Sequence, residues 1–178
     1  EDLRVVDAKG KAIIPGIVDC HTHLLWSGDR SSEMRLRQAG MTYRQIAEAG
    51  GGIAKTVQST RSMSLGDLCR IGIARANQAL LTGTTVIEAK SGYGLETEAE
   101  LRLLEAMKII NDSSIVKLLP TWLGAHDFPQ GRQRSEYLEE LVSSQLPAVA
   151  DQGIAKWVDV FCEEGWYTND ETENIVRA

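Results

Sequence analysis

Residues 12–23 read Ala-Ile-Ile-Pro-Gly-Ile-Val-Asp-Cys-His-Thr-His, an apolar run that ends in two histidines. The apolar part, 12–20, predicts a buried β-strand that is entered through a Pro-Gly turn. His21 and His23 are two positions apart, and in an extended strand such residues point to the same face of a sheet. Two neutral imidazoles on one face can bind a divalent metal ion. An isolated His-x-His pair is, however, more often a strand end lined by histidines without metal, so both interpretations stand at this point.

The rest of the chain alternates short apolar runs with amphipathic stretches. Further strands are predicted at 84–89, 115–123 and 157–162. Ser64 and Thr97 each precede an acidic residue by three positions, which is the spacing of a capping box at a helix start. Two more helices are predicted from about Ser135 to Ala150 and from near Asn169. Strands that alternate with helices indicate an α/β fold with a parallel sheet and right-handed crossovers.

The composition excludes several classes of function. The chain has 178 residues, a net charge of −6 and no basic run, which argues against nucleic acid or an anionic membrane as partner. No apolar stretch approaches the ~18 residues that a membrane span requires. The N-terminal residues do not form a secretion signal. Three widely spaced cysteines do not suggest a disulfide framework, so a cytoplasmic protein with reduced thiols is expected.

The residues around the histidine pair resemble a known superfamily. Pro15–Asp19 followed by His-x-His is similar to the opening strand of the amidohydrolases, in which the two histidines hold a catalytic metal inside a distorted barrel. Later segments narrow the resemblance to the imidazolonepropionase family. They fall in order along the chain at Gly28–Met34, Tyr43, Ala49–Ile53, Thr56–Arg61, Glu88–Leu95, Leu123–His126 and Val158–Gly165.

This resemblance implies a fold and a reaction. Residues 12–178 would form the first half of a TIM-like (β/α)8 barrel of the amidohydrolase type, and residues 1–11 the end of the family's small β-sandwich domain. The implied reaction hydrolyses the cyclic amide of 4-imidazolone-5-propanoate to N-formimidoyl-L-glutamate, a step of histidine degradation. One divalent metal ion, zinc or iron, held by His21 and His23, would activate the water. Family members are commonly dimers, so a homodimer is expected for the full-length protein.

The resemblance also assigns four substrate-binding residues. The family's substrate-binding arginine falls on Arg30, its two tyrosines fall on Tyr43 and Tyr93, and its substrate-contacting histidine falls on His126. The planar fork of an arginine suits the substrate's propionate group. Taken without the resemblance, Arg30 reads as a solvated loop charge and Tyr43 as a packed side chain. His126 reads as a core histidine or a third metal ligand.

Other notable residues receive no role in the chemistry. Three consecutive glycines at 50–52 allow a close approach of the backbone, but spacing alone favours a flexible turn. Glu88, Lys90, Glu163 and Glu164 lie at strand ends, where structural ion pairs explain them as well as catalysis does.

Two alternatives to the implied function stay open. The family's further ligands, a histidine on the fifth strand and an aspartate on the eighth, would fall beyond residue 178, so the chain by itself is expected to be inactive. The chain also begins in an apparent strand at 3–7 and stops in an apparent helix at 172–178. The first alternative is another deaminase or cyclic amidase of the superfamily, and the second is a non-catalytic half-barrel that binds a partner.

Overall fold

The computed structural model describes residues 3, 5–42, 45–46 and 49–178. Within this part of the chain, four strands form one parallel sheet in the order β1-β2-β3-β4. The strands are β1 (Ile17–Thr22), β2 (Thr84–Lys90), β3 (Lys117–Ala125) and β4 (Trp157–Val160). The predicted α/β class and the parallel sheet are therefore confirmed.

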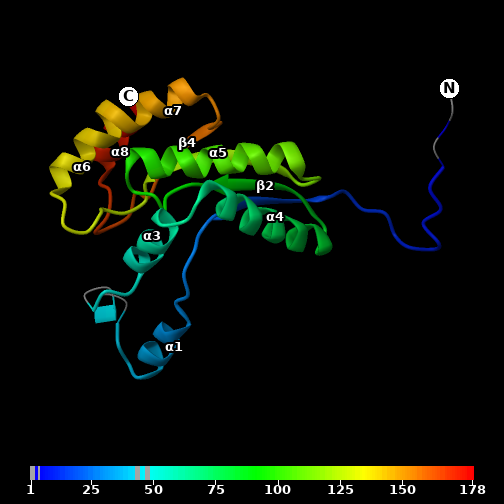
Figure 1. Cartoon of the computed structure of the whole chain (residues 1–178), viewed down its shortest axis with the longest axis horizontal. Coiled ribbons are helices and arrows are strands. Elements are labelled where there is room, and N and C mark those ends of the chain that lie inside the picture. The colour runs from blue at the N-terminus through cyan, green and yellow to red at the C-terminus, as the bar shows by residue number, and fades with distance from the viewer. Residues whose placement is uncertain (1–2, 4, 43–44, 47–48) are drawn as a thin grey trace.

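The helices follow the strands along the chain. They are α1 (Ser31–Gln38), α3 (Ile53–Arg61), α4 (Leu65–Leu81), α5 (Thr97–Ser113), α6 (Arg134–Glu140), the π-helical turn η1 (Leu141–Gln145), α7 (Leu146–Gln152) and α8 (Asn169–Arg177). Figure 1 shows α4 and α5 running side by side along the sheet, with α6 and α7 beyond α5 and with α1 and α3 together at one end. Consecutive parallel strands alternating with helices in this way are consistent with a partial TIM-like barrel.

Strand boundaries differ from the sequence-based expectation, most of all near the N-terminus; β3 begins and ends two residues later than predicted and β4 ends two residues earlier. The first strand begins at Ile17, not at residue 12, because ladder pairing with β2 starts at the Ile17–Thr84 pair. No strand forms at Leu3 or at Val5–Asp7 either, and Figure 1 shows the segment before β1 running away from the sheet. A strand without a neighbour leaves its backbone groups unpaired, so the local pattern alone does not produce one.

Helix capping confirms one prediction and corrects another. Ser64 is the N-cap of α4, and its hydroxyl accepts a hydrogen bond from the main-chain N–H of Asp67. Thr97 is not an N-cap, since α5 is preceded by Glu96 in the cap position and no side chain caps it. The acid at the capping-box position, Glu100, is turned toward a neighbouring loop, where other N–H groups compete for its carboxylate.

The hydrophobic core lies between the helices and the sheet. Its largest fully buried members include Leu103, Leu104, Met107 and Ile110 of α5, Leu68 of α4, Ile87 of β2 and Trp122 of β3. Burying side chains of this size contributes roughly 1.5–3 kcal/mol each, which fixes α5 against the centre of the sheet. The edge strands differ, and the prediction that the first strand is buried is wrong, because Ile17 and Val18 of β1 remain exposed, as do Trp157 and Val158 of β4. Among the described residues, no helix is both long and apolar enough to cross a membrane.

Candidate functional site

Three side chains that the sequence singled out meet where the strands end. His23 follows β1, Tyr93 follows β2 and His126 follows β3. The rings of His23 and His126 are stacked with 4.6 Å between centroids, and the ring of Tyr93 lies 4.8 Å from His23 and 5.4 Å from His126. His21 is still part of β1, and its ring centroid is 6.3 Å from that of His23. Because the strands are parallel and adjacent, their carboxyl ends bring these residues to one edge of the sheet.

His23 is held in its neutral form. Burial, followed by the nearby His126 and His21, lowers its pKa to about 3. Its Nδ1 atom is buried and has no hydrogen-bond partner among the described residues. A neutral imidazole with an unsatisfied ring nitrogen has the chemistry that a metal ligand requires. In the described ranges, no group of three or more His, Cys, Asp or Glu side chains is arranged to hold a metal ion. The residues present therefore fit part of a metal site.

The orientation of His126 is fixed by the loop after β2. Its Nδ1 atom lies 2.8 Å from the main-chain oxygen of Gly92. A carbonyl oxygen only accepts hydrogen bonds, so Nδ1 carries the proton in this contact and the other nitrogen, Nε2, is the acceptor in a neutral ring. The ring edge of His126 also meets Phe161 just after β4, at 6.0 Å between centroids.

The loop that carries Tyr93 is organised by Glu100, which sequence reasoning did not identify as part of the site. Glu100 is completely buried, and its carboxylate accepts hydrogen bonds from the main-chain N–H groups of Gly92, Gly94 and Leu95 at 2.7–2.9 Å. The guanidinium of Arg61 also binds this loop, because it donates hydrogen bonds to the main-chain oxygens of Gly94 and Leu95. The sequence signal for this role is an acidic residue in the first turn of a helix that follows a glycine-containing loop, because such a side chain can accept hydrogen bonds from the loop's N–H groups. Its spacing from Thr97 favoured the capping-box interpretation instead.

Arg30 lies on a cavity that also reaches Tyr93. The cavity has a volume of about 520 Å³, and its lining includes Trp26, Met34 and Thr56 as well as these two residues. Arg30 is half-buried and forms a bidentate ion pair with Glu33, which is 2.8 Å away at its shortest. Arg30 is thus a fixed charge at the wall of a cavity, which differs from the solvated loop charge that the residue type alone would suggest. Tyr43, the other expected tyrosine, lies outside the described residues.

The charged residues on β2, Glu88 and Lys90, take part in an ion-pair network. The Lys90 ammonium lies 2.9 Å from the Glu88 carboxylate and 2.8 Å from that of Asp159 on β4. Burial opposes the lysine's charge, but hydrogen bonds to Asp159 and Glu88 outweigh it and raise the pKa of Lys90. Glu88 also accepts a long hydrogen bond from the main-chain N–H of Thr22, between the two histidines of β1.

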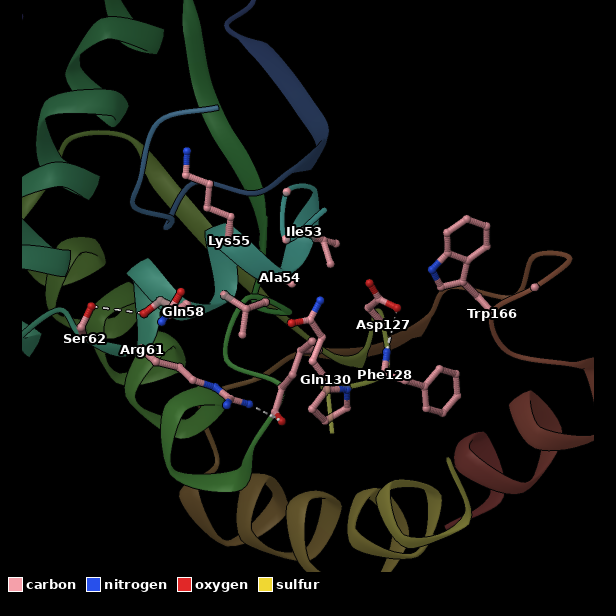
Figure 2. A pocket seen from close by; sticks show the side chains of 16 residues that line it. Ile53, Ala54, Lys55, Gln58, Arg61, Ser62, Asp127, Phe128, Gln130 and Trp166 are labelled. Atoms are coloured by element: carbon pink, nitrogen blue, oxygen red, sulfur yellow. Dashed lines mark hydrogen bonds between the residues drawn. The ribbon is translucent and has the colours of Figure 1, made fainter. Parts of the chain in front are cut away.

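A second and larger cavity has Asp127, the residue after His126, in its lining. It measures about 950 Å³ and lies between α3 and the loops after β3 and β4. Figure 2 shows the carboxylate of Asp127 and the amide of Gln130 facing its interior, whereas the ammonium of Lys55 points away. Burial raises the pKa of Asp127, the residue that directly follows His126. The arginine in its wall, Arg61, is already engaged with the main chain.

Comparison with known proteins identifies the family. No protein-family model matches the chain. The chain is 46% identical over 179 aligned residues to the imidazolonepropionase of Symbiobacterium thermophilum, an alignment that covers 99% of the chain and 42% of the relative. It is 44% identical to that of Myxococcus xanthus, over 98% of the chain and 42% of the relative, and 42% identical to that of Haloarcula marismortui, over 97% and 41%. By sequence, this chain belongs to the imidazolonepropionase family, and it spans about 42% of the length of the curated relatives that it matches.

Proposed function

We propose that this chain is part of an enzyme that hydrolyses 4-imidazolone-5-propanoate to N-formimidoyl-L-glutamate, a step of histidine degradation. One juxtaposition carries the proposal. Tyr93 lies against His23 on one side and lines the Arg30 cavity on the other. A substrate with a polar ring at one end and a carboxylate at the other would span from the histidine cluster to the guanidinium.

The fold and the metal site belong to the same proposal. Residues 12–178 would form the first half of an amidohydrolase-type barrel, and residues 1–11 the end of a small β-sandwich domain. His21 and His23 would hold one divalent cation, zinc or iron, together with ligands from the rest of the protein. The neutral state and unsatisfied nitrogen of His23 support this assignment. When bound, the cation supplies Lewis-acid activation of water and of the substrate carbonyl.

The residues of this chain would bind and orient the substrate. Arg30 would pair with the propionate through charge-assisted hydrogen bonds, and the Tyr93 hydroxyl would donate to the same carboxylate or to a ring nitrogen. His126 would accept a hydrogen bond from a ring N–H through Nε2, because its Nδ1 is already committed to Gly92. The oxygen of water then adds to the ring carbonyl carbon, the carbon–nitrogen bond of the ring breaks, and the nitrogen takes up a proton.

Three further expectations accompany the activity. The substrate would be a small anion, the full-length protein a homodimer, and the location cytoplasmic. Of the two competing functions, a superfamily deaminase acting on a neutral base leaves the fixed positive charge of Arg30 without a partner in the substrate. A non-catalytic half-barrel would have no need of a histidine such as His23, whose pKa is lowered by burial, close to Tyr93 at that cavity.

A coupled assay on the full-length protein tests the proposal. Imidazolone propionate is generated in situ from urocanate, its disappearance is followed by absorbance, and bound metal is determined in parallel. Metal-dependent consumption is expected, with loss of both metal and activity in His21→Ala and a raised KM in Arg30→Ala. Arg35→Ala, which replaces an exposed arginine on α1 just after Arg30, is the matched control and should behave like the wild type.

Other results would redirect the assignment. A protein that binds metal but does not consume the substrate would be a different amidohydrolase, and guanine is the first neutral base to test. A protein that binds no metal would support the non-catalytic half-barrel.

A further inference from the structure

The carboxylate of Glu33 forms hydrogen bonds and an ion pair with one edge of the Arg30 guanidinium. Glu33 sits in α1 three residues after Arg30, and only 5% of its surface is exposed. Arg30 donates through Nε to both carboxylate oxygens at 3.0 Å and through Nη2 to Oε2 at 2.8 Å. These hydrogen bonds lower the pKa of Glu33 despite its burial, and the N–H of Gly52 lowers it further. Glu33 is therefore ionised at neutral pH.

The glycine triplet at 50–52 holds Glu33 from the opposite side. The main-chain N–H of Gly52, the N-cap of α3, donates to Oε1 of Glu33 at 2.8 Å. Gly50 and Gly52 have φ values of 84° and 72°, in the left-handed region that favours glycine. A Cβ on Gly51 would lie 2.7 Å from the Ile46 side chain and 3.1 Å from the Glu33 carboxylate. Gly50 and Gly52 are thus favoured by their backbone conformation and Gly51 by the close approach to Ile46 and Glu33, so the segment is more than a flexible connection.

The guanidinium of Arg30 is held at one edge and stays partly accessible. Glu33 binds the Nε–Nη2 edge, and 31% of the Arg30 side chain remains exposed. Arg30 lines the 520 Å³ cavity together with Tyr93. A long arginine side chain that is already held in one geometry loses little freedom when it binds a carboxylate end-on, and such preorganisation raises affinity.

We propose that Glu33 is a positioning residue for carboxylate recognition: held by the 50–52 turn, it fixes Arg30 so that one edge of the guanidinium faces the carboxylate of an anionic ligand. This inference rests on the proposed function. Glu33 does not touch the ligand itself and acts through Arg30. Its contribution should therefore depend on the ligand's carboxylate and on the presence of Arg30.

The test uses the metal-loaded, full-length protein and the isosteric variant Glu33→Gln. The probe is 3-(imidazol-4-yl)propanoate, which lacks the scissile carbonyl, and its neutral carboxamide is the matched ligand. Dissociation constants are measured by calorimetry and steady-state constants with imidazolone propionate. Glu140→Gln, which removes a partly buried ion-paired carboxylate far along the chain on α6, is the control for general loss of stability.

In Glu33→Gln, Kd for the carboxylate probe and KM should both rise about tenfold, with kcat within about twofold of the wild type. Kd for the carboxamide should not change, and in an Arg30→Ala background the Glu33 substitution should add nothing. Equal weakening of both ligands, a fall in kcat at constant KM, or additivity with Arg30→Ala would overturn the inference. The absence of probe binding by the wild type would also overturn it.

The two proposals can fail separately. A wild type that binds the probe in a Glu33-dependent manner but does not hydrolyse imidazolone propionate would remove the proposed function and leave the positioning role of Glu33 standing.

Discussion

Replacing Glu100 by glutamine removes the charge that organises the loop of Tyr93. In the structure, Oε1 accepts from the N–H groups of Gly94 and Leu95 at 2.7 and 2.8 Å, and Oε2 accepts from that of Gly92 at 2.9 Å. An amide has one oxygen and one NH₂ group. If the oxygen takes the Oε1 position, two donors keep a neutral acceptor and the N–H of Gly92 faces another donor.

The expected cost follows from these three contacts. A hydrogen bond to a charged group contributes about 1.5–3 kcal/mol, and a buried donor left unpaired costs about 1–3 kcal/mol. Losing one such bond while weakening two others should lower the free energy of local opening by about 2–4 kcal/mol. At about 1.4 kcal/mol per tenfold, amide exchange in the loop should accelerate by roughly 30- to 700-fold.

Hydrogen exchange of the peptide that spans 91–95 measures this directly. Glu98→Gln is the matched control, because Glu98 lies in the same first turn of α5 but is exposed. Its loop should exchange as in the wild type. Wild-type exchange at Gly92, Gly94 and Leu95 in the Glu100→Gln protein would show that the carboxylate does not hold the loop, and the argument would be refuted.

Three further predictions concern other parts of the chain. If Arg30 binds the substrate as proposed, Gly51→Ala should raise KM without lowering kcat, because the new Cβ would lie 2.7 Å from Ile46 and 3.1 Å from the Glu33 carboxylate that pairs with Arg30; an unchanged KM in steady-state assays would count against this. The hydrogen bond from Arg134 lowers the pKa of Glu171 to about 2 from 4.5, and a lowered folded-state pKa stabilises above the unfolded value and is lost on acidification. The excess Tm of the wild type over Glu171→Gln should therefore be complete at about pH 6 and vanish as the pH falls toward about 2; a pH-independent difference would contradict it. Gly124→Ala should destabilise by about 1–3 kcal/mol in urea unfolding, since its Cβ would lie 2.4 Å from a buried glutamine oxygen. Gly66→Ala, whose Cβ has its nearest neighbour at 3.9 Å, should instead stabilise by about 0.5–1 kcal/mol, and effects of the same sign would refute the packing argument.

The residue pattern was sufficient for the order and type of the main elements. The apolar runs of β2 and β3 predict their strands because a strand buried in a parallel sheet is apolar on both faces. The capping of α4 by Ser64 was predictable for a similar reason, since both partners lie within one turn of the chain. The third strand tolerates Pro120, although proline has no main-chain N–H to donate. The carbonyl oxygen of Pro120 accepts a hydrogen bond from the N–H of Lys156, which lies just before β4 begins at Trp157. The missing N–H therefore falls where β4 has not yet begun.

Local pattern failed where distant groups compete for the same atom. Glu100 has the spacing of a capping-box acid, but three loop N–H groups hold its carboxylate. The triplet at 50–52 has the composition of a flexible turn, yet a carboxylate 19 positions earlier accepts from Gly52. Neither outcome is encoded in adjacent residues.

Part of the candidate site was also predictable from local sequence, and part of it depends on contacts between distant segments. The sequence by itself placed His21 and His23 together at the end of the first strand, because they directly follow its apolar run, and its family motifs pointed to Arg30, Tyr93 and His126. Only the tertiary structure decided that the rings of His23, Tyr93 and His126 lie close together, that burial keeps His23 neutral, and that Glu33 pairs with Arg30 at the wall of the cavity. Those properties depend on the pairing of parallel strands and on the exclusion of water by the assembled loops, and both arise only when segments far apart in the chain pack together.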